Sequence, residues 1–170
     1  QEIKSRCGSD FPVMLRFSPK SFIKDLRDGA LPGEKFVEKG RDLEEGIEAA
    51  KLLESYGYDA LDTDVGSYDA WWWSHPPMYQ EKGLYRPYCK MVKENTAIPI
   101  LCAGRMDDPN MALEAIEGGV CDVISFDERS VVLDTTAGSM AVEGENLHIT
   151  ILNIENKNVE IEGKINAVYY

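Results

Sequence analysis

The sequence predicts an α/β fold with parallel strands covered by helices, followed by a small antiparallel β-meander. Residues 98–126 carry the first signal, because two apolar segments flank one capped helix there. A strand, a helix and a second strand at this spacing form a βαβ unit, which joins parallel strands. The second signal comes after Phe126, where helix patterns stop and short segments alternate between apolar and polar residues. Such alternation is typical of antiparallel strands with one buried face.

Composition limits the class of protein. The 170 residues are 44% hydrophobic and 28% charged, which suits a soluble globular domain with a buried core. The formal net charge of -12 repels phosphate backbones and anionic lipids, so we expect neither nucleic acid nor a membrane as partner. The sequence has no apolar run that could span a bilayer and no signal-peptide pattern. The chain begins at Gln1, so we expect a fragment or a processed product.

The four cysteines do not have metal-binding spacing. Cys7, Cys89, Cys102 and Cys121 include no CxxC pair, so we expect no zinc or iron–sulfur site and no other metal site. Cys102 and Cys121 lie within apolar segments, where cysteine usually serves as a small buried side chain. This usage is typical of a reducing compartment, and we expect a cytoplasmic protein.

The first predicted strand ends near a charged residue. Residues 1–8 look like the end of a helix that stops at Gly8, and residues 11–18 form a short apolar strand. An arginine at the carboxyl end of such a strand is unusual, because an unpaired buried charge is costly. Arg16 either points at an anionic or electron-rich ligand above the strand ends or is a surface arginine at a strand terminus.

A long charged connection precedes a clear helix. Residues 20–40 show little periodicity, and long loops of this kind are often functional. Asp42 can cap the next helix, in which Leu43, Ile47 and Ala50 recur at helical spacing until Gly57 ends it.

The strand predicted for residues 58–66 carries two carboxylates on one face. Asp62 and Asp64 alternate with Leu61, Thr63 and Val65. Paired carboxylates can serve acid/base or metal chemistry. Near a strand end they are more often held by hydrogen bonds, and we favour this second interpretation.

Residues 67–83 form an aromatic loop made rigid by prolines. Three consecutive tryptophans, 71–73, offer flat contact area to a planar ligand or to a partner surface. His75 is the natural proton donor in this loop, because imidazole gains and loses a proton near neutral pH. Alternatively, the loop buries its tryptophans and His75 only fills space. A short helix over residues 84–92 follows.

The stretch 98–126 contains a candidate phosphate site. A buried strand leads into Ala103, Gly104 and Arg105, and Asp108 then caps a helix that Gly118 ends. In barrels built from βα units, the active site lies at the carboxyl ends of the strands, and the loops after the last two strands often hold a phosphate. A structural turn with an exposed arginine is the favoured alternative for such a short motif.

The last part of the chain predicts antiparallel strands separated by turns. Turns are expected near Ala137, at residues 144–146 and at residues 156–158, and apolar residues alternate between them. His148 falls on the polar face and is expected to be solvated. No group of residues in this part suggests catalysis.

Residues 1 to about 124 resemble the old yellow enzyme family of NADH:flavin oxidoreductases, in its enoate and 2,4-dienoyl-CoA reductase branch. The resemblance rests on DFPVMLRFSP, on residues 29–79 with DALDTDVGSYDAWWWSHPPMY, and on IPILCAGRMDDP. It implies strands five to eight of an FMN-binding (β/α)₈ TIM barrel. It further implies that Arg16 lies against the flavin's N1/O2 edge, that Ala103, Gly104 and Arg105 hold the FMN phosphate, and that His75 belongs to the substrate loop.

The implied function is that of a fragment of an FMN-dependent NADH:flavin oxidoreductase acting on an enoate or enoyl-CoA-like substrate. Strands one to four would be absent, so we expect the chain to be inactive or impaired alone, unless a homo-oligomer completes the barrel. Acidic residues Asp127 and Glu128 stand where the family completes its phosphate site, and two carboxylates repel a phosphate. The family's iron–sulfur cysteines are not expected in this chain.

Residues from about 123 to 170 are similar to the sporulation protein YabP. This resemblance rests on SFDERSVVLDTTAGSMAVEGENLHI and NVEIEGKINAVYY. The predicted units are therefore residues 1–124 and 125–170, joined inside a strand rather than in a linker, as in a fusion of two unrelated genes. The alternative function is a sporulation-associated interaction module without catalysis.

Overall fold

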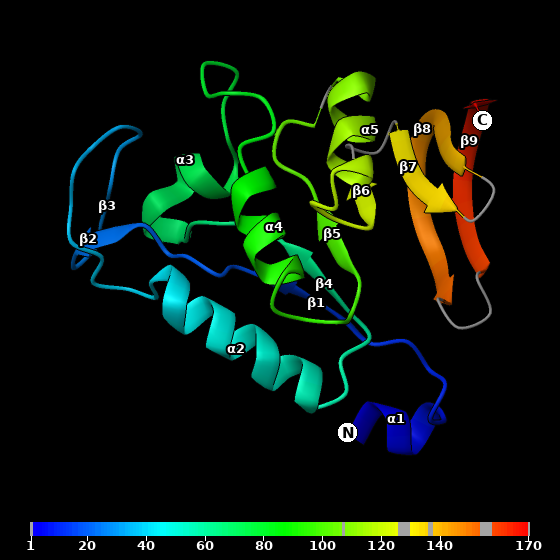
Figure 1. Ribbon diagram of the computed structural model, residues 1–170, viewed down its shortest axis with the longest axis horizontal. Helices are drawn as coiled ribbons and strands as arrows, with labels where there is room; N and C mark the ends of the chain where they lie inside the picture. The colour runs from blue at the N-terminus through cyan, green and yellow to red at the C-terminus, as the bar shows by residue number, and fades with distance from the viewer. Residues whose placement is uncertain (1, 107, 126–129, 136–137, 154–157, 170) are drawn as a thin grey trace.

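The computed structural model describes residues 2–106, 108–125, 130–135, 138–153 and 158–169 (Figure 1). The helices, including the short 3-10 helix η1, are α1 (Glu2–Cys7), α2 (Leu43–Ser55), η1 (Tyr68–Ala70), α3 (Trp71–Ser74), α4 (Arg86–Lys93) and α5 (Pro109–Glu117). The strands are β1 (Met14–Phe17), β2 (Ile23–Asp25), β3 (Asp28–Gly29), β4 (Ala60–Thr63), β5 (Ile100–Cys102), β6 (Val123–Ser125), β7 (Ser130–Thr135), β8 (Gly138–Asn153) and β9 (Asn158–Tyr169).

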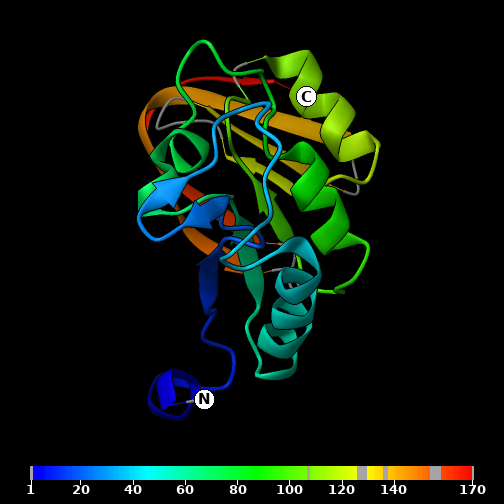
Figure 2. The same ribbon diagram turned by 90° about the vertical axis from the view of Figure 1, so that its left-hand side faces the viewer.

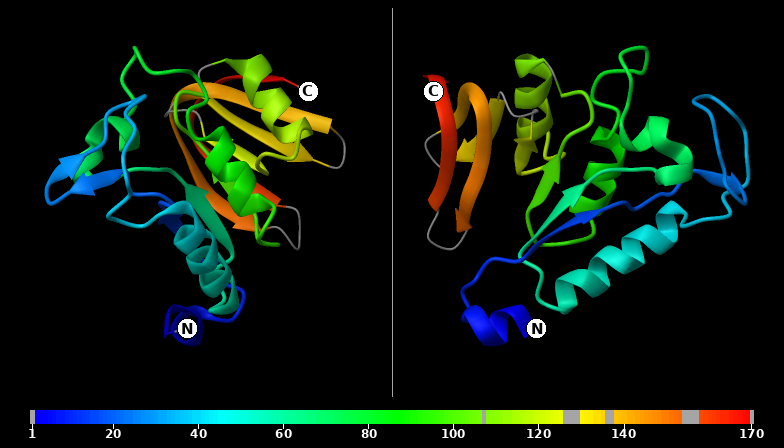
Figure 3. Two further views of the ribbon diagram at one scale, coloured as in Figure 1. Left: turned by 60° about the vertical axis from the view of Figure 1, so that its left-hand side comes forward. Right: turned by 180° about the vertical axis from the view of Figure 1, so that it is seen from behind.

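Within the described residues, one seven-stranded sheet runs in the order β1-β4-β5-β6-β7-β8-β9. The pairs β1–β4, β4–β5 and β5–β6 are parallel, whereas β6–β7, β7–β8 and β8–β9 are antiparallel. The predicted α/β class with parallel strands and a following antiparallel part is therefore confirmed. Figure 3 shows from two further sides how the antiparallel strands extend the parallel ones.

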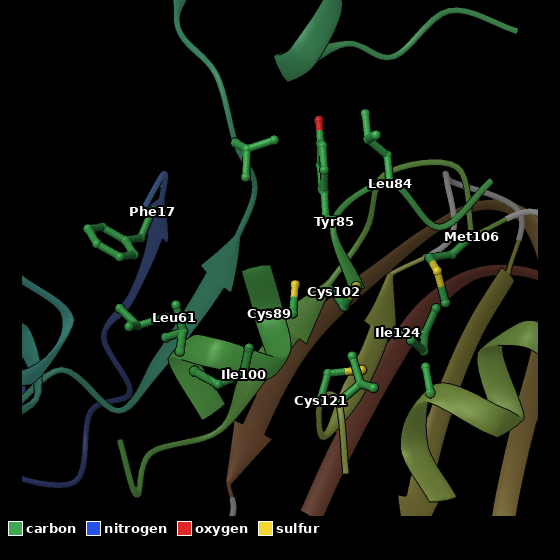
Figure 4. Packing of buried hydrophobic residues seen from close by; sticks show 14 of the residues in the cluster. Phe17, Leu61, Leu84, Tyr85, Cys89, Ile100, Cys102, Met106, Cys121 and Ile124 are labelled. Carbon is green, nitrogen blue, oxygen red and sulfur yellow. The ribbon is translucent and has the colours of Figure 1, made fainter. Parts of the chain in front are cut away.

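Both faces of the central parallel strands β5 and β6 are covered. One face packs against helices α2, α4 and α5 through the strand residues Phe17, Leu61, Ile100, Cys102 and Ile124 (Figure 4). The opposite face carries Ala60, Leu101 and Val123, which pack with Val142 and Leu147 of β8. The antiparallel part thus curls over the second face, and the short apolar runs of β5 and β6 are buried on both sides.

Local signals explain why α2 forms where the sequence predicts it. The Asp42 carboxylate accepts a hydrogen bond of 2.9 Å from the Glu45 amide, and the Glu45 side chain reaches back to the Asp42 amide. This capping box satisfies two amides that would otherwise lack partners. Gly46 lets α2 approach the preceding loop, because a Cβ there would lie 2.0 Å from the Pro19 carbonyl oxygen.

Helix α1 lies beyond the amino end of β1 and apart from the other helices (Figure 2). Its ammonium group at Lys4 forms an ion pair of 2.6 Å with Asp59, just before β4. The second Asp59 oxygen accepts a hydrogen bond of 2.7 Å from the Val13 amide. These contacts anchor the start of β1 to the start of β4.

The long connection predicted for residues 20–40 contains the short β2–β3 hairpin within otherwise irregular backbone. One predicted turn is wrong. No turn interrupts β8 at residues 144–146, because the strand continues to Asn153 with irregular register to β9. Gly144 instead allows β9 to approach β8 closely, since a Cβ at Gly144 would lie 2.3 Å from the Lys164 carbonyl oxygen. The predicted turns at residues 137 and 156–157 lie outside the described residues.

The edge of β6 is paired rather than open. Val123, Ile124 and Ser125 pair with Leu133, Val132 and Val131 of β7. The predicted boundary between residues 124 and 125 therefore falls within one strand of one continuous sheet. Among the described strands, the edges of the large sheet are β1 and β9. In the described part of the chain, no helix is long and apolar enough to cross a membrane.

Candidate functional site at the carboxyl ends of the parallel strands

The predicted site residues gather at one edge of the sheet. Because β1, β4 and β5 are parallel, the ends of all three strands meet at the same edge. Arg16 is the third residue of β1, Asp64 follows β4, and Ala103 to Arg105 follow β5. His75 lies just after α3, in the connection from β4 to α4. The topology thus brings together segments that lie far apart in the sequence.

Arg16 is paired with a carboxylate. Its Nε donates a hydrogen bond of 2.7 Å to Asp64 Oδ2, and the Ser18 hydroxyl donates one of 2.5 Å to the other oxygen. The Arg16 side chain remains 58% exposed, whereas that of Asp64 is 13% exposed. Burial alone would lower the pKa of Arg16, but the hydrogen bond and negative charge of Asp64 outweigh it and raise that pKa. Asp64 thus follows the favoured interpretation of a hydrogen-bonded carboxylate near a strand end.

Asp62 has a different environment from Asp64. It is the partner of Arg16 across β1 and β4, so the two side chains share one face of the sheet. Burial raises the pKa of Asp62, the positive charge of Arg16 opposes this change, and the charge of Asp64 adds to it. Burial therefore favours the neutral form of Asp62, which lies near Arg16 on the same face of the sheet.

The Gly104–Arg105 turn is built against an aromatic ring that the sequence interpretation did not include. Gly104 and Arg105 have φ angles of 77° and 59°. A Cβ at Gly104 would lie 2.5 Å from the ring of Tyr85. The amides of Gly83 and Leu84 donate hydrogen bonds of 3.0 Å to the Arg105 and Gly104 carbonyls. Glycine is therefore required at 104 by both backbone conformation and contact.

The Arg105 guanidinium crosses to the aromatic loop. Its Nη1 donates hydrogen bonds to the carbonyl oxygens of Met78, at 2.5 Å, and of Gln80. Its side chain therefore helps to hold the loop that contains His75. These bonds agree with the alternative of a structural turn, except that Arg105 is half-buried rather than exposed.

Tyr85 links the strand ends to the same loop. Its hydroxyl is 2.8 Å from the Trp73 carbonyl oxygen and 2.7 Å from that of Ser74, and it donates to these two acceptors. Burial, with the nearby charge of Asp64, raises the pKa of Tyr85. Figure 4 shows its ring beyond the carboxyl end of β4. A tyrosine at the start of a helix carries no sequence signal for this role, because its partners come from another segment.

The three consecutive tryptophans have different roles. The indole N–H groups of Trp72 and Trp73 both donate to the Ala30 carbonyl, at 2.8 and 2.7 Å. Trp71 is 48% exposed, and its ring stacks on the exposed His75 with centroids 3.8 Å apart. The loop therefore buries Trp73 and holds Trp72, and it displays Trp71 and His75 to solvent.

Three cysteines form a buried group beneath the site. Cys89, Cys102 and Cys121 are buried and reduced, and their thiols lie close together (Figure 4). The hydrogen bond with Cys102 and then burial raise the pKa of Cys121. The bond to Cys121 lowers the pKa of Cys102, but the hydrogen bond with Cys89 and burial outweigh it and raise that pKa. Neutral thiols of this kind serve as core side chains. In the ranges that the structure describes, no group of three or more potential metal ligands occurs.

Comparison with known proteins identifies relatives for both parts of the chain. Over 126 residues it is 62% identical to a cinnamate reductase of Clostridium sporogenes, which covers 74% of this chain and 19% of that relative. Over 144 residues it is 28% identical to an NADH oxidase of Thermoanaerobacter brockii, which covers 85% of this chain and 20% of that relative. A model of the YabP family matches residues 112–170. The chain thus spans about a fifth of the length of these curated relatives.

A solved structure supports the fold. The chain superposes on a 2-naphthoyl-CoA reductase in complex with 2-naphthoyl-CoA with a TM-score of 0.53 and 23% identity. The match covers 70% of this chain and 16% of that chain. Both resemblances drawn from the sequence are therefore confirmed: one to oxidoreductases of the enoate reductase type, the other to the YabP family. The YabP match begins within α5, earlier than the sequence resemblance placed it.

Proposed function

We propose that the chain is part of an FMN-dependent, NADH-linked reductase that acts on α,β-unsaturated acids or their CoA thioesters. The observation that carries this proposal is the 62% identity to cinnamate reductase over 126 residues, which make up 74% of this chain. The placement of Arg16, His75 and the Gly104–Arg105 turn at one edge of parallel strands agrees with it. The four parallel strands would correspond to strands five to eight of a TIM barrel, with residues 1–124 and 125–170 as separate units.

The residues around Arg16 fit a flavin ring. Bound FMN would supply hydride transfer to a conjugated double bond. Arg16 uses Nε for Asp64, and its half-exposed guanidinium retains further N–H groups for an electron-rich ring edge. A positive charge there stabilises a reduced, anionic ring, and Asp64 fixes the direction of the guanidinium.

The phosphate end fits less completely. The backbone at Gly104 and Arg105 could hold an anion through amide groups, as Ala103 would at the start of the turn. The Arg105 guanidinium already binds loop carbonyls, so a phosphate would have to compete with them. The acidic residues 127 and 128 lie outside the described residues. We therefore expect weak FMN binding and impaired turnover by the chain alone.

His75 is the proposed proton-handling residue of the substrate loop. It is exposed, and stacking on Trp71 holds its ring in one plane. Tyr85 cannot replace His75 as the proton donor, because the Tyr85 hydroxyl already donates its proton to two backbone carbonyl oxygens. A cytoplasmic location and a homo-oligomer remain part of the proposal; because β7 occupies the edge of β6, self-association would use β1 or β9.

Titration of FMN into the purified chain tests this function. We expect saturable quenching of flavin fluorescence, and about 10- to 100-fold weaker binding in Arg16→Ala and in Arg105→Ala, since charged hydrogen bonds contribute about 1.5–3 kcal/mol. Arg27→Ala is the matched control, because it removes the same charge from an exposed arginine in the turn between β2 and β3, outside β1 and the turn after β5. Absence of quenching in a folded sample would refute FMN binding.

A second candidate function rests on the YabP match at residues 112–170. In this proposal β7, β8 and β9 form an interaction module of sporulating cells, without catalysis. Ile165 and Val168 on the edge strand β9 are 49% and 43% exposed and would contact the partner. In this proposal, a labelled chain that carries Ile165→Lys should lose its localisation in sporulating cells. A chain that carries Leu26→Lys should keep its localisation, because Leu26 is 89% exposed and lies outside β7, β8 and β9.

A further inference from the structure

Strand β1 has one unpaired edge. Within the described residues it pairs only with β4. The carbonyls of Val13 and Phe17 accept hydrogen bonds of 2.9 and 3.0 Å from amides of the residues that flank β4. Because the backbone groups of successive strand residues alternate in direction, Leu15 also faces β4. The N–H and C=O groups of Met14 and Arg16 therefore point away from β4, toward the open edge.

A groove runs along this open edge, between β1 and α2 (Figures 1 and 3). It has a volume of about 430 Å³, and its lining includes residues 15–18 of the β1 side and Ala49, Leu52, Leu53 and Tyr56 of α2 and its carboxyl end. A second hollow of about 380 Å³, next to α1, shares Tyr56 with the groove. Unpaired backbone thus borders the groove on one side, and an apolar helix surface borders it on the other.

The surface around the groove is apolar enough for a protein interface. Met14, Leu52 and Tyr56 are 51%, 54% and 59% exposed, and Phe11, just before β1, is 47% exposed. In two copies of the chain these side chains together expose on the order of 800 Å². A homodimer interface of standard size buries about 1,600 Å², of which about 65% is apolar. The four side chains therefore supply most of the apolar area that a stable dimer needs.

We propose that this edge binds a second copy of the chain, with the two β1 strands antiparallel across a two-fold axis. A register centred on Leu15 places Met14 of each copy opposite Arg16 of the other, so the outward N–H and C=O groups of both residues gain partners. A register centred on Met14 would instead set Arg16 opposite Pro12, which has no N–H to donate. The Leu15 side chains of the two copies then meet at the axis, beside the two α2 helices.

Symmetry favours β1 over β9 as the partner of β1. Pairing of β1 with β1 uses the same surface on both copies and is complete with two copies, whereas pairing of β1 with β9 leaves an edge free at each end and continues as a filament. The second copy extends the sheet and does not close a barrel. The dimer therefore depends on the open edge and its groove alone, and not on the proposed reductase function.

Disulfide cross-linking of the complete chain tests the register. The exposed Cys7 is first replaced, in Cys7→Ser, because the other three cysteines are buried. In this background Leu15→Cys should form a disulfide-linked dimer upon oxidation with diamide, because the Cα atoms of such a non-hydrogen-bonded pair lie about 4.5 Å apart. Met14→Cys is the matched control. Met14 is more exposed than Leu15, but its two copies would lie about 7–8 Å apart, too far for a disulfide.

Sedimentation of the chain without cross-links tests the interface itself. We expect a dimer, and at least about tenfold weaker dimerisation in Met14→Pro, because the change removes one outward N–H from each copy. Proline is tolerated on an edge strand, and the bonds from β1 to β4 come from other residues. Val168→Lys is the control on the other edge strand, where Val168 is 43% exposed, and it should leave the dimer unchanged.

Each outcome decides for or against the dimer. A disulfide at Leu15→Cys, with a dimer that Met14→Pro weakens, supports it. A monomeric folded wild-type chain, a series of larger assemblies, a dimer lost upon Val168→Lys, or cross-linking at Met14→Cys in place of Leu15→Cys overturns it. If Leu15→Cys does not fold, the sedimentation results decide. None of these measurements involves flavin, so failure of the FMN titration leaves the dimer standing, and a monomeric chain leaves FMN binding standing.

Discussion

Strand β5 of the parallel part and the edge strand β9 of the antiparallel part differ in how completely their described side chains are buried. All three residues of β5 are buried, because helices cover one face and β8 covers the other. In β9, by contrast, Ile165 and Val168 are about half-exposed, and the strand forms an edge. The comparison indicates that a central parallel strand is buried on both faces, whereas the edge strand β9 is open to solvent at these two side chains. Among the side chains whose burial the structure describes, Val142 and Leu147 of β8 cover the second face of the parallel strands.

The largest expected effect comes from removing side chains in the two parts. Leu61→Ala in β4 should lower the free energy of unfolding by about 2–5 kcal/mol, because the side chain is fully buried among helix residues. Ile165→Ala in β9 should cost less than about 1 kcal/mol, as expected at an exposed site. Chemical denaturation of both variants measures the difference. Equal losses would contradict the comparison.

The next largest effect on stability separates two reasons for a glycine in the parallel part: a close side-chain contact and a positive φ angle. Gly104→Ala and Gly119→Ala both place a side chain at positive φ, at 77° and 65°. Only Gly104 has a neighbour in the way, the Tyr85 ring, whereas no atom lies within 4 Å of a Cβ at Gly119. We expect about 1–2 kcal/mol loss at 119 and about 1–3 kcal/mol more at 104. Thermal unfolding of the pair tests this, and a smaller loss at 104 would refute the contact.

A smaller effect concerns the cap of α2, which supports the parallel part. Asp42→Ala should lower the free energy of unfolding by about 1 kcal/mol, since the Glu45 amide loses its acceptor. Glu44→Ala is the control, because it changes a charge in the same turn without removing the cap. If the two variants unfold alike, the helix dipole rather than the hydrogen bond explains the role of Asp42.

The smallest effect is a change in pH dependence at Asp62. Because its pKa is raised, the native carboxyl keeps its proton to a higher pH than the unfolded chain, whose aspartates titrate near pH 3.9. Ionisation of Asp62 therefore lowers stability as pH rises from that unfolded value through the native one. Asp62→Asn should remove this decline, and the exposed Asp69→Asn should not. Unfolding temperatures across the acid range provide the measurement, and parallel curves would count against burial as the cause.

The sequence predicted the local elements of the parallel part well. The Asp42 capping box, the stop at Gly57 and the Asp108 cap before Pro109 each depend on residues within a few positions. Local hydrogen bonds and helical spacing suffice for such predictions. The turn predicted at residues 144–146 was wrong because it relied on the same local signals. Glycine is needed at position 144 by the close approach of Lys164 on the neighbouring strand, not by the residues next to it in the sequence.

Of the candidate site, the sequence supplied Arg16, His75 and the turn from Ala103 to Arg105, but not the contacts between them and their partners. The pairing of Arg16 with Asp64 joins positions 48 apart, and the contact of Arg105 with Gln80 joins positions 25 apart. Nothing in the pattern around Tyr85 indicates that its ring lies under Gly104. Such contacts depend on strand order, which residue periodicity does not specify.

By itself, the sequence determined the helices with their caps, the buried strands, the reduced cysteines and the change from parallel to antiparallel strands near residue 125. Only the tertiary structure decided that β7 occupies the edge of β6, that β8 covers the second face, and that one tryptophan of three is displayed to solvent. The physical reason is that caps and periodicity act over a few residues. Edge pairing, burial and ring stacking depend instead on segments that meet only after the chain has folded.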